Sequence, residues 1–415
     1  MLWRPVGDSR ACAKLLAMFQ KLAERARTSE IDLRLLLPLL LSTLLVQVVT
    51  AILRITTSYR AVELNLSLVW LGVIAATFAL FPILIAVSVG RFIDRGHDAH
   101  TSWFGGALFL VACFGFAFWQ STAGLIASTA VMGIGHICLM ASQQMLCVRA
   151  GGPRHIESAF GNYMVAGAIG QGLGPYIVGW AGGAATVPPT HTLFVIGLVI
   201  AGLSLAVILT MRPARAVPHE AIGEPVVPIS ALVRVPGLAA VVIAGVIMVS
   251  ASDIILIYVP LLGTERHIDV KDIGWLLTVR AAASMVARLF YVRMVELTGR
   301  WPLMIASTFA CACAFAAMAA PLTFWPMVAI MVVMGCSFGL ATTLSITIVV
   351  DMTTAGARGT ANSLRIMGNR AGQFVLPFGA GLVAAASGLA GLLLVIAAAI
   401  AVAAAAMYRV RPTAR

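Results

Sequence analysis

The sequence contains little charge: only 11% of its 415 residues are Asp, Glu, Lys or Arg, whereas roughly a quarter of an ordinary soluble domain is charged. Apolar residue types make up 60% of the chain, and the mean hydropathy is +0.98. A soluble globular protein is therefore excluded.

Motifs for catalysis or metal binding are also absent. The 7 cysteines have neither metal-ligand nor redox spacing and are interpreted as small packing residues. No nucleotide-binding loop, paired catalytic carboxylates or nucleophile motif occurs, and the loops are too short to build a catalytic domain. We therefore expect no enzyme and no cofactor, and a membrane enzyme or receptor is the least favoured function.

The chain is instead rich in apolar stretches of about 20 residues, the length that crosses a bilayer as a helix. They predict an all-α polytopic membrane protein with twelve transmembrane helices. The expected spans are 33–57, 67–90, 103–121, 123–147, 160–183, 192–211, 235–261, 273–292, 301–320, 324–350, 361–386 and 389–408.

The net charge of +12 is explained by where the basic residues lie. With a cytoplasmic amino terminus, the opposite side holds only Arg54, Arg60, Arg266 and Lys271, and most of the 28 basic residues fall on the cytoplasmic side. This bias predicts an integral protein of the bacterial inner (plasma) membrane with both termini in the cytoplasm. It requires no nucleic-acid partner. Arg54, near the outer end of the first span, is expected to be an interfacial anchor, and the alternative is that it attracts anions.

Shifting the sequence by 202 residues aligns several features of its two halves without a gap. Gly72 meets Gly274, and the strongest match places residues 170–175 (GQGLGP) on 372–377 (GQFVLP). The repeat predicts two six-helix bundles. The expected divisions are a cytoplasmic segment 1–32, bundle 33–211, linker 212–232, bundle 233–408 and tail 409–415. For residues 1–32, an amphipathic surface helix and an unstructured start both remain open.

The loop after the second span, residues 90–96 (GRFIDRG), resembles a loop motif of the major facilitator superfamily. The resemblance extends over nearly the whole chain and implies a transporter in which the two bundles rock about a central site. It carries over Gly90, Asp94 and Arg95 as gating residues, and the repeat adds Arg293 and Glu296. The alternative is that these are solvated loop charges that only set the topology.

Two glycine- and proline-containing stretches predict close helix packing. Gly170, Gly174, Pro175 and Gly179 are similar to a motif found in many exporters of the same superfamily, although Gly179 lies one place late. Gly372 and Pro377 repeat part of the pattern in the other half, which weakens the specific inference of export.

Charged residues inside membrane spans are costly and are therefore candidates for function. Four arginines face a single carboxylate within the spans, so we expect an anionic solute. Its predicted ligands are Arg280, Arg370, Asn369, Gln373 and Arg288, while Arg365 lies nearer the cytoplasm. The alternative is an internal ion pair, Asp253 with Arg280.

Asp253 and His136 are the expected proton-coupling residues, because burial and a neighbouring arginine can change their charge. The sequence thus predicts a secondary active transporter of a small organic anion, coupled to protons and working by alternating access as a monomer in membrane lipid. The alternative is a proton-driven efflux pump for varied hydrophobic compounds.

Overall fold

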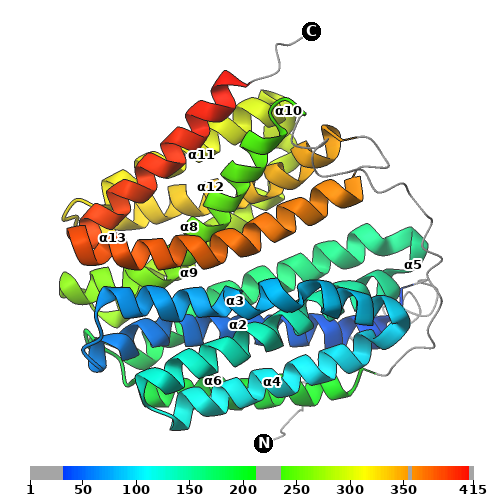
Figure 1. Ribbon diagram of the computed structural model, residues 1–415, viewed down its shortest axis with the longest axis horizontal. Coiled ribbons are helices and arrows are strands. Elements are labelled where there is room, and N and C mark those ends of the chain that lie inside the picture. Colours follow the sequence, from blue (N-terminus) through cyan, green and yellow to red (C-terminus); the bar gives the residue numbers. More distant parts are fainter. Residues whose placement is uncertain (1–30, 212–234, 354–357, 411–415) are drawn as a thin grey trace, which may run out of the picture.

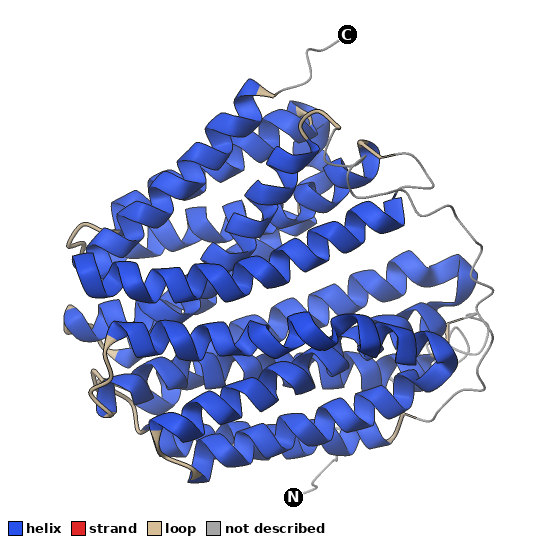
Figure 2. Ribbon diagram, in the orientation of Figure 1, coloured by secondary structure: helices blue, strands red, loops and turns tan. Residues whose placement is uncertain are grey.

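The computed structural model describes residues 31–211, 235–353 and 358–410, and every regular element within them is a helix (Figures 1 and 2). The elements are α2 (Leu33–Glu63), α3 (Leu68–Phe92), the short π-helical turn η1 (Ile93–His97), α4 (Asp98–Phe118), α5 (Thr122–Gly182), α6 (Thr190–Leu209), α8 (Leu238–Glu265), α9 (Val270–Leu289), α10 (Tyr291–Thr298), α11 (Arg300–Met318), α12 (Phe324–Asp351) and α13 (Arg358–Arg409). The expected amphipathic segment and the linker 212–232 lie outside these residues, apart from positions 31 and 32.

Two of these helices each contain two spans. α5 is interrupted at Gly152 and His155, whose backbone angles are not helical, and α13 is interrupted at Gly388 with φ 73°. By length and apolarity, eight helices qualify as membrane spans, or nine when the bent pair α9 and α10 is counted once. Dividing α5 and α13 at their breaks, and counting α9 with α10 as one, gives twelve helices in the described residues, which agrees with the predicted all-α fold class of twelve helices.

Local sequence explains where several helices begin and turn. Asp32 caps α2, its Oδ1 accepting from the backbone N–H groups of Arg34 and Leu35 at 3.0 and 3.3 Å. Gly96 has φ 87°, a conformation that glycine adopts without strain, and this reverses the chain between α3 and α4.

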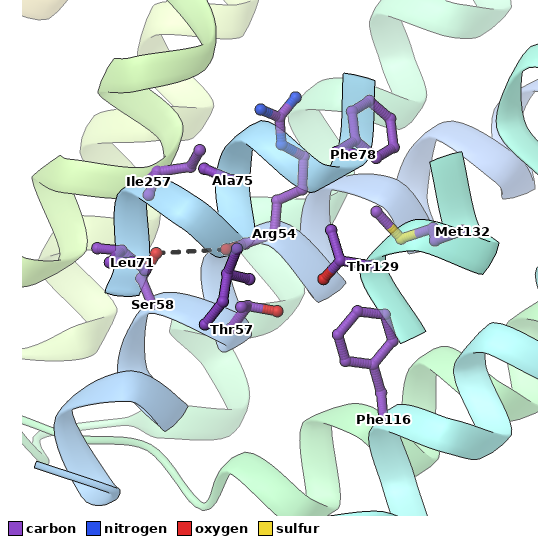
Figure 3. A pocket seen from close by; sticks show the side chains of 11 residues that line it. Arg54, Thr57, Ser58, Leu71, Ala75, Phe78, Phe116, Thr129, Met132 and Ile257 are labelled. Atoms are coloured by element: carbon purple, nitrogen blue, oxygen red, sulfur yellow. Dashed lines mark hydrogen bonds between the residues drawn. The ribbon is translucent and has the colours of Figure 1, made fainter. Parts of the chain in front are cut away.

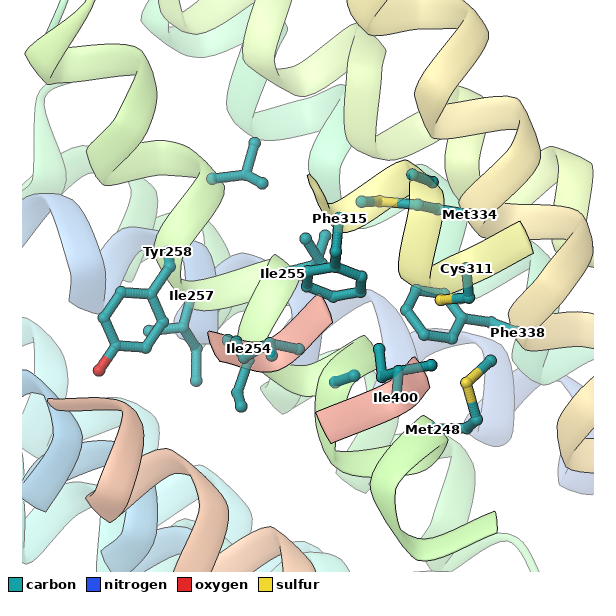
Figure 4. Packing of buried hydrophobic residues seen from close by; sticks show 14 of the residues in the cluster. Met248, Ile254, Ile255, Ile257, Tyr258, Cys311, Phe315, Met334, Phe338 and Ile400 are labelled. Atoms are coloured by element: carbon teal, nitrogen blue, oxygen red, sulfur yellow. The ribbon is translucent and has the colours of Figure 1, made fainter. Parts of the chain in front are cut away.

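Residues 33–211 form one half of the molecule and residues 235–409 the other, and Figure 1 shows them stacked with their helices roughly aligned. One apolar cluster lies within the first half, and a larger one fills the second half and extends to first-half residues such as Ile52 and Leu71. In the second half the larger cluster contains Phe315, Phe338, Met334 and Met248, from three different helices (Figure 4). We call the end where residues 211 and 235 lie the linker end.

At the end away from the linker, the halves touch through two pairs of glycines. A Cβ atom added to Gly72 of α3 would lie 2.8 Å from Cα of Gly381 in α13, and one added to Gly179 of α5 would lie 3.1 Å from Cα of Gly274 in α9. The N–H groups of Val270 and Lys271 also donate to carbonyls of Ala185 and Gly183, at 2.8 and 3.0 Å. Only glycine permits backbones to approach this closely.

The linker end differs. Further hydrogen bonds between the halves lie nearer the middle of the helices, where Oγ1 of Thr278 donates to the Gly172 carbonyl at 3.2 Å and Arg54 pairs with Asp253. Toward the linker end the ribbons of the two halves diverge in Figure 1. Within the described residues, the closest backbone contacts between the halves therefore lie at the end away from the linker.

Candidate substrate cavity

A cavity of about 240 Å³ lies between the two halves, and both contribute to its wall. The first half supplies amide, hydroxyl and aromatic groups together with a single arginine; the second half supplies three arginines and a carboxylate. The lining residues are Gln47, Thr50, Ala51, Arg54, Phe78, His136, Gln171, Val249, Ser252, Asp253, Leu256, Arg280, Arg288, Thr342, Arg370 and Gln373.

An ion pair crosses the cavity from one half to the other. Nη1 of Arg54 on α2 donates to Oδ1 of Asp253 on α8 at 2.9 Å, and the two side chains are only 10% and 18% exposed. The other carboxylate oxygen, Oδ2, accepts from Nε2 of Gln373 on α13 at 2.8 Å. Both oxygens of Asp253 are thus occupied, and its ion-pair partner is Arg54, not the Arg280 of the alternative interpretation.

The position of Arg54 differs from that of the interfacial anchor expected from the sequence. α2 continues to Glu63, six residues beyond the predicted end of the first span, so Arg54 lies deep in the bundle. Its guanidinium lies beside the ring of Phe78, with 5.0 Å between Cζ and the ring centroid (Figure 3). The sequence argument missed this residue because it ended the helix too early.

Arg280 and Arg288 project into the cavity from α9, two helical turns apart. Nη1 of Arg280 donates to Oγ of Ser252 at 3.0 Å, and its Cζ lies 5.8 Å from the centroid of the Phe338 ring. Nη2 of Arg288 donates to Oγ1 of Thr342 at 3.5 Å. Arg280 is buried and Arg288 half-buried, and their described partners are neutral.

Only some of the α13 residues predicted to bind substrate line the cavity. Arg370 and Gln373 line the cavity, and Nη1 of Arg370 donates to Oε1 of Gln373 at 3.1 Å. Asn369 does not line it, although its Oδ1 is buried and has no hydrogen-bond partner in the described residues. Arg365 also lies outside the cavity wall.

His136 on α5 lies in the cavity wall, as expected for a proton-coupling residue. Its ring centroid is 5.3 Å from that of Phe78, and only 9% of the residue is exposed. Its Nε2 is buried and forms no hydrogen bond to the described residues. The imidazole therefore has one nitrogen without a partner among the described residues, and its role in coupling remains a prediction.

The predicted gating residues all lie at the linker end. Asp94, Arg95, Arg293 and Glu296 are exposed, Gly90 is half-buried, and within the described part of the chain none forms an ion pair with the other half. This placement fits a gate that pairs only when the linker end closes, and it equally fits solvated loop charges.

The predicted packing residues have two different kinds of neighbour. Gly170 and Gly174 of α5 lie against α2, and Gly372 of α13 lies against Val246 of α8, so these contacts stay within one half. Gly179 alone of the predicted glycines lies across the boundary, against Gly274.

The two predicted prolines lie at the boundary between the halves. A Cβ added to Gly274 would lie 2.7 Å from the carbonyl oxygen of Pro175, and one added to Gly72 would lie 2.8 Å from that of Pro377. Each proline carbonyl is therefore part of a glycine contact between the halves.

Comparisons with known proteins agree with this architecture. The model of the Major Facilitator Superfamily matches residues 39–269 and 241–415. Among solved structures, a mutant form of the nucleoside transporter NupG is 16% identical, with a TM-score of 0.79 over 91% of this chain and 100% of that one. A bacterial homolog of the human lysosomal transporter Spinster, in an inward-facing and occupied conformation, is 15% identical, with a TM-score of 0.73 over 91% of this chain and 96% of that one.

The D-xylose-proton symporter is 15% identical, with a TM-score of 0.72 over 91% of this chain and 98% of that one. At these identities the likeness shows the fold alone. No curated protein sequence matches the chain.

Proposed function

Since the chain belongs to the Major Facilitator Superfamily and is thus an integral membrane transporter rather than an enzyme, we propose that it carries a small organic anion and couples the movement to protons. Alternating access would move the cavity between the two sides as the halves rock. The observation that carries the proposal is the composition of the cavity wall, where, among the described residues, Arg54, Arg280, Arg288 and Arg370 face a single carboxylate, Asp253.

Guanidinium groups suit an anion because their planar forks match the oxygen atoms of carboxylates and phosphates. In a cavity between helices, an excess of positive charge is unfavourable until a negative partner enters. Arg280 on α9 and Arg370 on α13 are the proposed principal ligands, and Gln373 is a neutral hydrogen-bonding ligand beside them. Asn369 would contribute only after a movement of α13, because it lies outside the cavity wall in this state.

Proton coupling is proposed to act through Asp253. Protonation would remove the charge of Asp253 and weaken two contacts at the cavity. These are the ion pair with Arg54, which joins the two halves, and the hydrogen bond from Gln373, which joins α13 to α8. Arg54 would then be available to the solute, so proton and anion would be linked through one group. His136, in the opposite wall of the cavity, is the second candidate.

The efflux of varied hydrophobic compounds is the less favoured function. Lipophilic cations would meet the same four arginines, and the repulsion would oppose their entry. The exporter-like glycines do not favour export specifically, since Gly170 and Gly174 serve packing within one half.

Reconstituted liposomes provide the test. We expect radiolabelled organic anions to exchange across the membrane, and an inward or outward pH gradient to concentrate them. Nucleosides, D-xylose and lipophilic cations serve as comparison solutes at the same concentration. Exchange of a neutral solute or a cation, together with no exchange of any anion, would contradict the proposal.

A further inference from the structure

The cavity has more positive charge than one monovalent anion can balance. Asp253 is the only acidic residue in its described wall, and its two oxygens accept from Arg54 at 2.9 Å and from Gln373 at 2.8 Å. Arg54 and Asp253 therefore neutralise one another. Three other arginines in the wall are left without an acidic partner in the described part of the chain.

The first two of these lie on α9. Arg280 is 8% exposed and Arg288 is half-buried, and their partners are the hydroxyls of Ser252 and Thr342. The Nε atoms of both side chains are buried and have no hydrogen-bond acceptor within the described residues. A buried cation with unused donors is costly unless a partner supplies negative charge.

The third arginine lies on a different helix. Arg370 of α13 donates to Oε1 of Gln373, whose amide in turn donates to Asp253. Arg280 instead reaches Ser252, the neighbour of Asp253 on α8. The two guanidinium groups therefore approach α8 from α9 and from α13, on separate helices, and they present two places where an anionic group can bind.

We infer that the substrate carries at least two negative charges, as a dicarboxylate or a phosphate-bearing compound does. One anionic group binds Arg280 and Arg288 on α9, and the second binds Arg370 on α13. A dianion brings the charge of the cavity close to balance, whereas a monoanion leaves two guanidinium groups unpaired. This inference rests on the proposed transport of an organic anion and makes its substrate class narrower.

Ligand-dependent thermal stability of the purified full-length protein tests the inference, because a ligand that binds the folded state raises the melting temperature. Three pairs of probes are matched in carbon skeleton: succinate with butyrate, adipate with hexanoate, and phthalate with benzoate. We expect at least one dianion to reach half-maximal stabilisation at about a tenfold lower concentration than its monoanionic partner, a difference of about 1.4 kcal/mol.

Variants identify the side chains responsible. Arg288→Gln and Arg370→Gln should each reduce the preference for the dianion to about threefold or less, whereas Arg288→Lys should keep part of it because the charge remains. Arg409→Gln, an exposed residue at the end of α13, is the control and should leave the preference unchanged.

Two outcomes separate this inference from the proposed function. If no dianion exceeds its monoanionic partner while monoanions bind in an Arg280-dependent way, the dianion inference fails and anion transport stands. If none of the six anions stabilises the protein, both the inference and the proposed function are overturned.

Discussion

The two halves of the molecule share a packing framework and differ in chemistry. With the offset of 202 residues, Phe78 corresponds to Arg280 and His136 to Phe338. Both pairs lie in contact: the rings of Phe78 and His136 are 5.3 Å apart, and Arg280 lies 5.8 Å from the Phe338 ring. Each half therefore has an aromatic side chain beside a basic one at these corresponding positions. The aromatic residue is on α3 in the first half, and the basic residue is on the corresponding helix, α9, in the second half.

The framework beneath these pairs is the same. Gly133 lies against the carbonyl of Phe78 in the first half, and Gly335 lies against the carbonyl of Arg280 in the second. The glycine contacts between the halves obey the offset too, since Gly179 corresponds to Gly381. The repeat therefore preserves the positions that allow helices to approach, while the side chains at positions 78, 136, 280 and 338 differ between the halves.

The ion pairs at the linker end also differ between the halves. Asp98 pairs with Arg149 in the first half, and the corresponding positions hold Arg300 and Asp351, which pair with the signs exchanged. In the first pair the Asp98 side chain is 0% exposed and that of Arg149 23%, whereas the side chains of the second pair are 45% and 50% exposed. Equivalent contacts thus lie in unequal environments.

The largest expected effect comes from removing one partner of the buried pair. Arg149→Gln leaves the buried Asp98 carboxylate with the Ala99 N–H as its remaining partner among the described residues, and it should lower the free energy of unfolding by about 3 kcal/mol. Arg300→Gln should lower the free energy of unfolding by less than about 1 kcal/mol, because water solvates the side chains of both Arg300 and Asp351. Reversible unfolding in mixed micelles measures both values.

The exchanged pair supplies the control. Asp98→Arg combined with Arg149→Asp gives the first half the arrangement of the second, and it should restore most of the lost stability. Equal costs for Arg149→Gln and Arg300→Gln would show that the difference in burial has no energetic consequence.

The next effect contrasts the corresponding residues Arg280 and Phe78. Arg280→Ala should weaken anion binding about a hundredfold, because truncating one side of a buried charged contact costs about 2–5 kcal/mol. Phe78→Ala removes a ring beside Arg54 and should weaken binding about tenfold or less. Equilibrium binding of a labelled anion provides the measurement. Unchanged binding in Arg280→Ala and in Arg370→Ala would exclude the assigned ligands.

The glycine contacts give a prediction in which the halves should agree. Gly72→Val and Gly274→Val each place a side chain against the backbone of the other half, where overpacking costs about 1–3 kcal/mol. Both variants should shift the population about tenfold or more toward the state that is open at the end away from the linker. Distances between spin labels on the loops of the two halves report this shift.

Gly379→Val is the matched control, since a Cβ at this position of α13 has no atom within 4 Å. A shift in only one of the two variants would mean that the two glycine contacts are not equivalent.

The sequence predicted the framework better than the cavity. Apolar runs and the repeat placed twelve spans and located Asp253, Arg280, Arg288, Arg370 and Gln373, which all line the cavity. Arg54 was misplaced because the end of a span in the interface is poorly marked by hydropathy, and α2 extends further than its apolar run. Partners such as Arg54 and Asp253, 199 positions apart, depend on the packing of two halves and have no local signal.

The smallest predicted effect tests whether Asp253, the one carboxylate in the described cavity wall, couples proton movement to anion transport. Asp253→Asn keeps the shape of the side chain but removes the charge that holds Arg54 at 2.9 Å, so protonation can no longer switch the contact. We expect uptake driven by a pH gradient to fall about tenfold, a change of about 1.4 kcal/mol, while exchange of anion for anion persists because Arg280 and Arg370 are unchanged. Parallel flux assays in liposomes, with and without a gradient, separate the two activities. Normal concentrative uptake in the variant would assign proton coupling to another group, and His136 of the first half would be tested next. Loss of both uptake and exchange would make Asp253 a structural partner of Arg54 instead of a proton carrier.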